Sequence, residues 1–241
     1  MITFPTLGAI GRLGNHLFQI SATIGLALEN GDSFGFPRWQ YEGQFGLSGC
    51  FHDELPEGKD YYEPNFHYRP IPYEKNLKLF GFYQSEKYFG SHRDEIRNLL
   101  TPRRMNPKLH GVASVQVRRG DYLLLSNKHP ILPSSYYVGA VGYLMERGIS
   151  KFKVFSDDLA WCREHFQSPP FEVAPDMSDI EQFESTLACE HHIMANSTFS
   201  WWSAWLDQNP DKIVIAPKKW FGPGYAHFDT KDLIPEPWIV M

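Results

Sequence analysis

Two short segments of this sequence combine residue types that suit the binding of a phosphate group. In the first, the alternating β-branched residues 111–117 run directly into Arg118 and Arg119. In the second, a hydroxyl-rich turn at residues 197–199 separates an apolar run from an aromatic amphipathic segment. Guanidinium groups form bidentate hydrogen bonds with phosphate oxygens, and the unpaired N–H groups at a helix N-terminus bind anions. These segments indicate recognition of a small phosphate-bearing ligand.

Each segment also has a purely structural interpretation. The turn could supply Ser197 or Ser200 as the N-cap of a helix whose three tryptophans fill a core. The arginines could form a solvated charge cluster at the end of an exposed strand. The two segments taken singly leave these alternatives open.

Period-two alternation gives the neighbouring arginines different tasks. It places Gln116 and Arg118 on one face of the predicted strand and Arg119 on the other. Ligands bind at the carboxyl ends of strands in open α/β sheets, so we expect Arg118 to bind a diphosphate. We expect Arg119 to pair with Asp121 or with a neighbouring loop.

A pair of aspartates, Asp157 and Asp158, follows the predicted strand at residues 152–155. Closely spaced aspartates after a strand can hold a divalent metal, and they can equally cap the helix that follows. His191 and His192 lack a carboxylate at ligand spacing, so we interpret them as strand residues rather than metal ligands.

The N-terminal part of the chain offers a second group of candidates. Residues 8–15 form a glycine-punctuated loop, in which Arg12 could reach a phosphate. Asn15 opens a segment with helical spacing, and it either caps that helix or contacts a ligand. Residues 61–73 are rich in Tyr, Pro, Asn and His, which predicts an irregular loop. Its aromatic faces either bind a sugar or simply cover a core.

The remaining elements alternate between strands and helices, which predicts parallel sheets. The expected strands are residues 76–82, 111–117, 152–155, the run before Asn196, and 213–216. The expected helices are residues 85–100, 134–147, one ending near residue 166, 179–190, and the aromatic segment. The proline-broken, basic residues 101–110 suggest a hinge between an N-terminal domain at residues 1–100 and a C-terminal domain at residues 108–241.

The composition limits the partners of the chain. Its 241 residues, 42% of them hydrophobic, can bury one large or two small cores. The net charge of −5 gives no electrostatic case for nucleic acid as a partner. Three cysteines without a C-x-x-C spacing argue against a disulfide framework or a structural zinc. No apolar run reaches membrane-spanning length, so we expect a cytoplasmic protein without a transmembrane segment, with peripheral association to a membrane left open.

Six motifs, in order along the chain, resemble those of the α-1,2-fucosyltransferases of glycosyltransferase family 11. They are residues 11–19 (GRLGNHLFQ), 81–89 (GFYQSEKYF), 118–122 (RRGDY), 129–137 (HPILPSSYY), 155–158 (FSDD) and 196–206 (NSTFSWWSAWL). The last is the most specific, whereas the first is also similar to a turn of protein O-fucosyltransferases. The resemblance implies a GT-B-like α/β fold, with two Rossmann-like α/β/α domains whose parallel sheets face across a cleft.

The resemblance further implies inverting, metal-independent transfer of L-fucose from GDP-fucose to the 2-hydroxyl of a terminal galactose in an oligosaccharide. GDP-fucose is then the donor substrate, and no cofactor is needed. The catalytic residues that we expect are Arg118 and Asp121. The expected donor-binding residues are Arg12, Asn15, Gln116, Arg119, Asp157, Asp158, Ser197, Thr198 and Phe199. The expected acceptor-binding residues are His16, Tyr61, Tyr62 and Tyr68, and no metal ligand is expected.

Three alternatives stay open within this interpretation. Asp121 is the carboxylate nearest in sequence to Arg118, but neighbouring Arg119 stabilises its charged form and weakens it as a base. If no strong base is needed, Asn15 or His16 could merely orient the acceptor hydroxyl. The chain could also act on another sugar or on protein, or bind a GDP-sugar without transferring it. Gln116, where the family usually has histidine, cannot carry a proton, so we expect a positioning role there.

Overall fold

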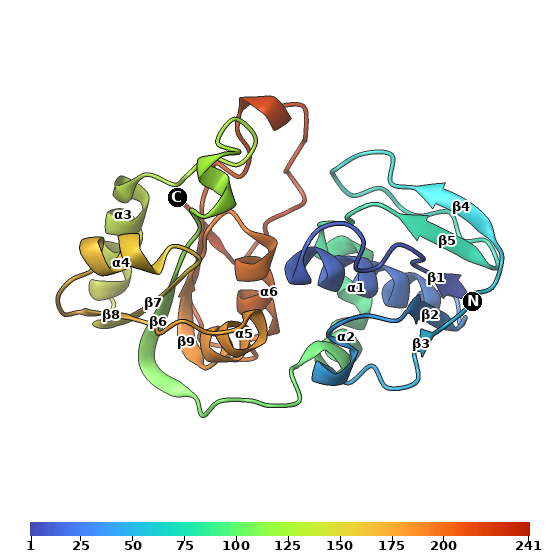
Figure 1. The fold of residues 1–241 in the computed structure, drawn as a ribbon, viewed down its shortest axis with the longest axis horizontal. Helices are drawn as coiled ribbons and strands as arrows, with labels where there is room; N and C mark the ends of the chain where they lie inside the picture. The colour runs from blue at the N-terminus through green and yellow to red at the C-terminus, as the bar shows by residue number, and fades with distance from the viewer. The chain divides into compact units, whose positions relative to one another are not determined.

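The computed structural model describes all 241 residues and divides them into two compact units. The first comprises Met1–Arg104 and Phe228–Pro235, and the second comprises Met105–His227 and Glu236–Met241. Each unit holds one β-sheet in which every strand pairing is parallel (Figure 1). The predicted parallel α/β architecture is confirmed.

The first unit is built on a sheet with the strand order β3-β2-β1-β5-β4. Its strands are β1 (Ile2–Thr3), β2 (Phe34–Pro37), β3 (Phe51–His52), β4 (Lys59–Tyr62) and β5 (Leu77–Phe80). Helix α1 (Leu13–Glu29) follows β1, and the shorter α2 (Arg93–Leu100) packs against it. Almost the whole of α1 is buried, including the polar His16 and Gln19, and most of its other residues are apolar or small. Three single-turn 3₁₀ helices, Glu42–Gln44, Glu86–Tyr88 and Gly90–His92, complete this unit.

The second unit is built on a sheet with the strand order β11-β10-β9-β6-β7-β8. Its strands are β6 (Leu109–Val117), β7 (Lys151–Ser156), β8 (Phe171–Val173), β9 (Cys189–Ile193), β10 (Val214–Ala216) and β11 (Ile239–Val240). Its helices are α3 (Ser134–Met145), α4 (Leu159–His165), α5 (Asp179–Leu187) and α6 (Thr198–Leu206). Two 3₁₀ turns, Asp121–Leu123 and Pro223–Tyr225, lie in its loops.

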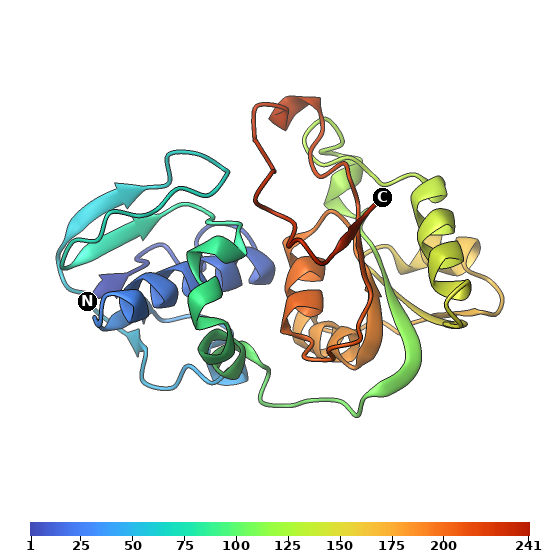
Figure 2. The same cartoon turned by 180° about the vertical axis from the view of Figure 1, so that it is seen from behind.

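The two faces of the second sheet are covered by different helices. Ala113, Val115 and Val117 belong to one apolar cluster with residues of α3 and α4, whereas the side chain of Gln116 reaches α5. Figures 1 and 2 accordingly show α3 and α4 on one side of β6 and α6 on the other. The period-two alternation of β6 therefore places its odd and even residues on opposite faces, as predicted.

Helix boundaries in the first unit differ from the prediction. Helix α1 begins at Leu13 with Arg12 as its N-cap, so the prediction that Asn15 caps this helix is wrong. The predicted helix over residues 85–100 is two 3₁₀ turns followed by α2. Here the backbone lies so close to α1 that a Cβ on Gly25 would meet the carbonyl oxygen of Tyr88 at 2.4 Å. Tertiary packing overrides the helical spacing of this segment.

The predictions for residues 61–73 and 179–190 are also partly wrong, again because of tertiary contacts. Residues 61 and 62 lie in β4, which pairs with β5 over four residues, so the predicted irregular loop at residues 61–73 begins inside the sheet. The predicted helix at residues 179–190 ends at Leu187, and the chain enters β9 two residues later. In both places strand pairing with distant residues outweighs local composition.

The C-terminal segment also departs from the expected division at residues 108–241, since residues 228–235 belong to the first unit. The ring of Phe228 stacks on that of Phe66, with 5.3 Å between centroids. The Asp232 carboxylate accepts a hydrogen bond from the Tyr68 backbone N–H and pairs with Lys87. These contacts join residues 145 to 164 positions apart, which sequence spacing cannot reveal.

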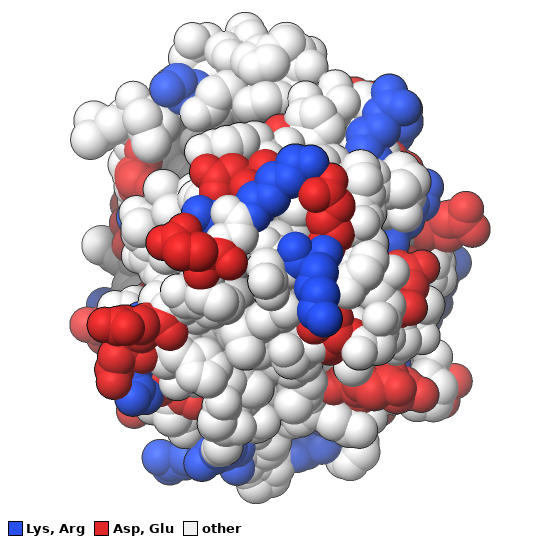
Figure 3. Space-filling view, turned by 90° about the vertical axis from the view of Figure 1, so that its right-hand side faces the viewer, with Lys and Arg blue, Asp and Glu red and all other residues white.

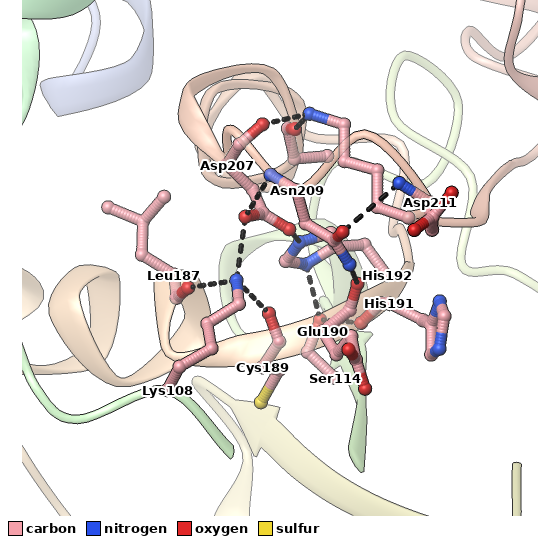
Figure 4. Close-up of polar contacts among 12 residues, drawn as sticks. Lys108, Ser114, Leu187, Cys189, Glu190, His191, His192, Asp207, Asn209 and Asp211 are labelled. Carbon is pink, nitrogen blue, oxygen red and sulfur yellow. Dashed lines mark hydrogen bonds and ion pairs between the residues drawn. The ribbon is translucent and has the colours of Figure 1, made fainter. Parts of the chain in front are cut away.

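A buried charged network joins the second sheet to the end of α6 (Figure 4). The Ser114 hydroxyl lies 2.9 Å from His192 Nδ1, and His192 Nε2 lies 3.0 Å from Asp207 Oδ2. Lys108 Nζ donates to Asp207 Oδ1 at 2.6 Å and to two backbone carbonyls. The interpretation of His192 as a strand residue is confirmed, and its carboxylate partner comes from the chain 15 positions away.

The surface of the first unit carries both signs of charge. Basic and acidic side chains alternate over the face drawn in Figure 3, without a continuous basic patch. The ion pairs of this unit include Lys78 with Asp60 at 2.9 Å and Arg38 with Asp53 at 2.8 Å. None of the helices combines the length and the apolar character that crossing a membrane would require.

Candidate functional site

The carboxyl edge of the second sheet gathers most of the predicted donor-binding residues. Strand β6 pairs in parallel with both β7 and β9, so the three strands end at the same edge. Arg118 follows β6, Asp157 follows β7, and Asn196 lies between β9 and α6. Ligands bind at this edge in open α/β sheets.

Arg118 is held between two carboxylates. One guanidinium nitrogen lies 2.6 Å from Asp121 Oδ1, and the other lies 2.8 Å from Asp157 Oδ2. The side chain remains 20% exposed. A guanidinium carries five N–H donors in a fixed fork, so two ion pairs orient it without exhausting its donors. Arg118 is thus a pre-oriented cation at the ligand edge.

Arg119 is directed into its own unit. Its Nε donates to Asp158 Oδ2 at 3.0 Å, and its guanidinium lies 4.2 Å from the centre of the Trp161 ring. The prediction of a neighbouring-loop partner is confirmed, whereas the alternative pairing with Asp121 is wrong because Arg118 occupies that carboxylate. The two arginines therefore differ in environment as the strand alternation indicated.

The aspartate pair is tied to the backbone around it. Asp158 accepts the Trp161 N–H at 3.2 Å and so caps α4, while Asp157 accepts the Arg119 N–H at 2.9 Å. A Cβ on Gly120 would lie 2.5 Å from Asp157 Oδ2, so only glycine allows this close approach. The capping alternative is confirmed for Asp158. No group of three or more His, Cys, Asp or Glu side chains suited to a metal ion occurs in the structure.

The turn between β9 and α6 is fixed on several sides. Ser197 is the N-cap of α6 and accepts the Phe199 N–H at 3.3 Å, so the alternative cap at Ser200 is wrong. The buried Asn196 amide donates to the carbonyls of Pro130 and Trp220, at 2.9 and 3.1 Å. Ser197, Thr198 and Phe199 remain partly exposed at the helix N-terminus, where backbone N–H groups suit an anion.

Gln116 is placed differently from its neighbours in the predicted donor site. Its side chain is 5% exposed and donates to Thr186 Oγ1 at 2.9 Å, on helix α5. This contact holds α5 against the sheet. The structure thus gives Gln116 a packing partner, and a direct contact with donor stays a prediction.

The first unit brings part of the predicted set together at the carboxyl edge of its own sheet. Asn15 Oδ1 accepts a hydrogen bond from Gln84 Nε2 at 3.0 Å, which connects α1 to the segment after β5. Gly11 has φ +83°, and a Cβ there would lie 2.6 Å from the Asn15 side chain. Asn15 is therefore packed onto the loop that carries Arg12. Gln84, within the motif at residues 81–89, thus contacts a predicted site residue, although it is not among the residues expected from the sequence.

His16 lies in the interior of the first unit. Its Nδ1 accepts from Trp39 Nε1 at 3.1 Å, and because an indole N–H only donates, the neutral ring carries its proton on Nε2. Burial is the main cause that lowers the pKa of His16, against the opposing effect of the Ile10 carbonyl. With 2% exposure, His16 supports the loop rather than presenting a face to a ligand.

The three predicted acceptor tyrosines differ in exposure. Tyr62 is 65% exposed and stacks on Phe80 with 4.8 Å between ring centroids, so it presents a flat aromatic face. Tyr61 and Tyr68 are half-buried, and the Tyr68 ring packs against Tyr88. Among these residues Tyr62 is best placed to stack on a sugar.

Glu63, directly after β4, was missed by sequence interpretation. Its carboxylate accepts the backbone N–H groups of Phe82 and Tyr83, at 2.7 and 3.0 Å. Burial raises its pKa to about 7 despite these two hydrogen bonds. The residues next to Glu63 in the sequence do not indicate this environment, because it is created by the pairing of β4 with β5.

Comparison with solved structures agrees with this architecture. The chain superposes on a fucosyltransferase NodZ from Bradyrhizobium with a TM-score of 0.51 and 12% identity, covering 84% of this chain and 91% of that one. It superposes on the E. coli heptosyltransferase WaaC with a TM-score of 0.50 and 12% identity, covering 99% and 92%. The fold is therefore that of the GT-B glycosyltransferases, as predicted.

Sequence comparison then defines the family. The model of glycosyl transferase family 11 matches residues 55–240. The chain is 30% identical to an alpha-1,2-colitosyltransferase of Escherichia coli over 95% of this chain and 96% of that protein. It is 26% identical to the galactoside alpha-(1,2)-fucosyltransferase 2 of Oryctolagus cuniculus over 88% of this chain and 69% of that protein. This chain belongs to glycosyl transferase family 11, and the recognition from its motifs is confirmed.

Proposed function

We propose that this protein transfers L-fucose from GDP-fucose to the 2-hydroxyl of a terminal galactose in a glycan. The observation that carries the proposal is the shared linkage of its relatives, since the E. coli and the rabbit enzyme are both named as α-1,2-transferases. The mammalian relatives are further named as galactoside fucosyltransferases, which supports both the sugar and the acceptor.

The reaction is a single displacement with inversion at the anomeric carbon. The acceptor oxygen bonds to C1 while the C1–O bond to the β-phosphate breaks, and GDP leaves with the bonding electrons. Negative charge grows on that phosphate, so catalysis rests on preorganised positive charge and N–H donors. Arg118, held by Asp121 and Asp157, supplies the charge, and the N-terminus of α6 at Ser197 supplies the donors. No step requires a metal ion.

The test is transfer of labelled fucose from GDP-fucose to lactose and N-acetyllactosamine in excess EDTA. We expect turnover to persist in EDTA and to fall at least about a hundredfold in Arg118→Ala, because one such donor contributes roughly 2.7–4 kcal/mol in the transition state. Arg163→Ala, an exposed arginine on α4, is the matched control and should match the wild type. Loss of turnover in EDTA, restored by a divalent ion, would refute metal independence. GDP binding without any product would favour a silent binding module.

A second candidate donor is a colitose nucleotide. The observation that favours it is the 30% identity to a colitosyltransferase along nearly the whole length of both chains. Colitose lacks one ring hydroxyl of L-fucose, so discrimination depends on whether the site hydrogen-bonds that hydroxyl. A competition between the GDP-fucose and GDP-colitose donors, at equal concentration, decides between them by the ratio of products.

A further inference from the structure

Glu63 lies where the first sheet would meet a ligand. Its backbone N–H donates to the Phe80 carbonyl at 2.8 Å, so the pairing of β4 with β5 continues to this residue. Both strands run parallel to β1, and the loop after β1 leads into α1. The carboxyl edge of the sheet therefore carries Glu63 together with the hydrogen-bonded pair of Gln84 and Asn15.

The backbone around Glu63 adopts conformations that side chains rarely allow. Gly81 has φ +152°, and a Cβ there would lie 2.4 Å from the Glu63 Cβ and 2.7 Å from its Oε2. Tyr83 has φ +52°, which is unusual for a bulky residue. This turn directs two N–H groups at the carboxylate. A carboxylate offers about four lone-pair positions, so both oxygens keep the capacity to accept a further proton or hydrogen bond.

The surroundings of Glu63 raise its proton affinity into the neutral range. Burial is the dominant cause of the raised pKa of Glu63, about 7. The titratable groups that interact with it are the phenols of Tyr61, Tyr83 and Tyr88. Burial raises the pKa of each phenol, so all three stay neutral at pH 7 and leave the carboxylate without a counter-charge. A general base works best when its pKa lies near the operating pH.

Asp121, the carboxylate expected from sequence to act as base, has the opposite environment. It lies 2.6 Å from the Arg118 guanidinium, and this ion pair serves to orient Arg118 at the carboxyl edge of the second sheet. The base is better sought on the first unit, where the acceptor residues are predicted.

We infer that the Glu63 carboxylate accepts the proton of the acceptor hydroxyl during transfer, an inference that rests on the function proposed above. As the acceptor oxygen bonds to C1 of the donor sugar, its proton passes to Glu63, and GDP departs with the electrons of the broken C1–O bond. The neutral carboxylic acid then returns its proton to water after product release. The two N–H groups hold the carboxylate in place throughout.

The test is the pH dependence of kcat/KM for lactose, at saturating GDP-fucose, in the wild type and in Glu63→Gln. The wild-type value should fall about tenfold for each pH unit below 7 and level off above it. Glu63→Gln should lose about 10²- to 10⁴-fold and show no inflection in this range. Asp60→Asn, a carboxylate on β4 that pairs with Lys78, is the matched control and should keep the wild-type profile. The titration of His16 falls below 6.5, apart from that of Glu63.

Each outcome supports or overturns the inference. If Glu63→Gln keeps the inflection near pH 7, Glu63 only stabilises the turn at Phe82 and Tyr83 and is not the base. A wild-type profile without an inflection near pH 7 would also overturn the inference. If Glu63→Gln does not fold, Glu63→Asp replaces it: a reduced rate with a displaced inflection supports the role, and an undisplaced one refutes it. A wild type that transfers to no acceptor contradicts the proposed function itself, before any variant is compared.

Discussion

Two clusters of charge lie at opposite ends of strand β6, and they differ in how far water reaches them. Lys108 precedes the strand and pairs with Asp207, which in turn contacts His192 (Figure 4). Arg118 follows the strand and pairs with Asp121 and Asp157. In the first cluster Lys108 is 31% exposed, but the side chains of His192 and Asp207 are only 2% and 4% exposed. In the second cluster the side chains of Arg118, Asp157 and Asp121 are 20%, 24% and 36% exposed. The carboxylate of the first cluster is therefore closed to a ligand, whereas those of the second are open to one.

The buried cluster shows that residue types alone do not define a catalytic site. Ser114, His192 and Asp207 form a hydrogen-bonded series with the residue types of a serine-hydrolase triad, but the serine contacts Nδ1 and the aspartate contacts Nε2, the reverse of the catalytic arrangement. Ser114 is also fully buried, so no substrate can reach its hydroxyl. Burial lowers the pKa of His192 and keeps its ring neutral. The series joins β6, β9 and the end of α6, and its role is to hold the sheet together. The comparison therefore assigns stability to one end of β6 and chemistry to the other.

Two single substitutions should separate these roles. Asp207→Asn leaves Lys108 and His192 without their charged partner, and breaking a buried pair costs about 3–5 kcal/mol. For a chain of this size that lowers the melting temperature by roughly 6–20 °C. Arg118→Ala should leave the melting temperature close to that of the wild type while turnover falls at least about a hundredfold. Calorimetry and the transfer assay, applied to both variants, measure the two effects.

The control for the stability effect is Asp211→Asn, an exposed aspartate four residues further along the chain. It should melt with the wild type. An Asp207→Asn protein that melts normally, or an Arg118→Ala protein that melts as early as Asp207→Asn, would contradict the division of roles between the two ends of β6.

Acid should weaken the buried cluster in two steps. Burial lowers the pKa of His192 in the folded protein. Below pH 6.5 the imidazole is therefore protonated in the unfolded chain but stays neutral in the folded protein, and the free energy of unfolding falls as the pH falls. Burial alone would raise the pKa of Asp207, but its hydrogen bonds with His192 and Lys108 lower it to about 2. Its contribution, about 2 kcal/mol, is present above pH 4 and is lost between pH 4 and 2.

Urea unfolding of the wild type and of Asp207→Asn, at several pH values from 7.5 to 2.5, measures this dependence. The variant should lack the loss below pH 4 while it keeps that of the buried histidines. Parallel curves for the two proteins over the lowest pH range would refute the assignment to Asp207.

The sequence allows the exposed cluster to be predicted better than the buried one. Arg118, Asp157 and Ser197 each follow a strand of ordinary length, so periodicity places them at one sheet edge. The partner of His192 lies 15 residues away, at the end of another element, where no periodicity indicates it. The choice of Asp121 by Arg118 rather than Arg119 likewise depends on side-chain directions that only the folded structure supplies.

Short strands explain what the sequence did not reveal in the first unit. Strands β1 and β3 have two residues each, too few to show an alternation. The pairing of β4 with β5 puts Glu63 next to Gly81, and this tertiary contact creates the buried carboxylate. By contrast, the helical spacing of α1 was visible, and only its first residues were assigned wrongly.

The smallest expected effect separates two serines of the second unit that both cap helices, only one of which is predicted to bind a ligand. Ser178 caps α5 with a complete capping box, and Ser197 caps α6 at the proposed phosphate site. Replacing either by alanine removes one hydrogen bond to the first turn, so each variant should lose about 1 kcal/mol of stability. Only Ser197→Ala should also weaken GDP binding, roughly tenfold, because its hydroxyl can additionally donate to the phosphate. Calorimetric titration with GDP measures this, and equal affinities in the two variants would remove Ser197 from the donor site and leave it, like Ser178, as a helix cap alone.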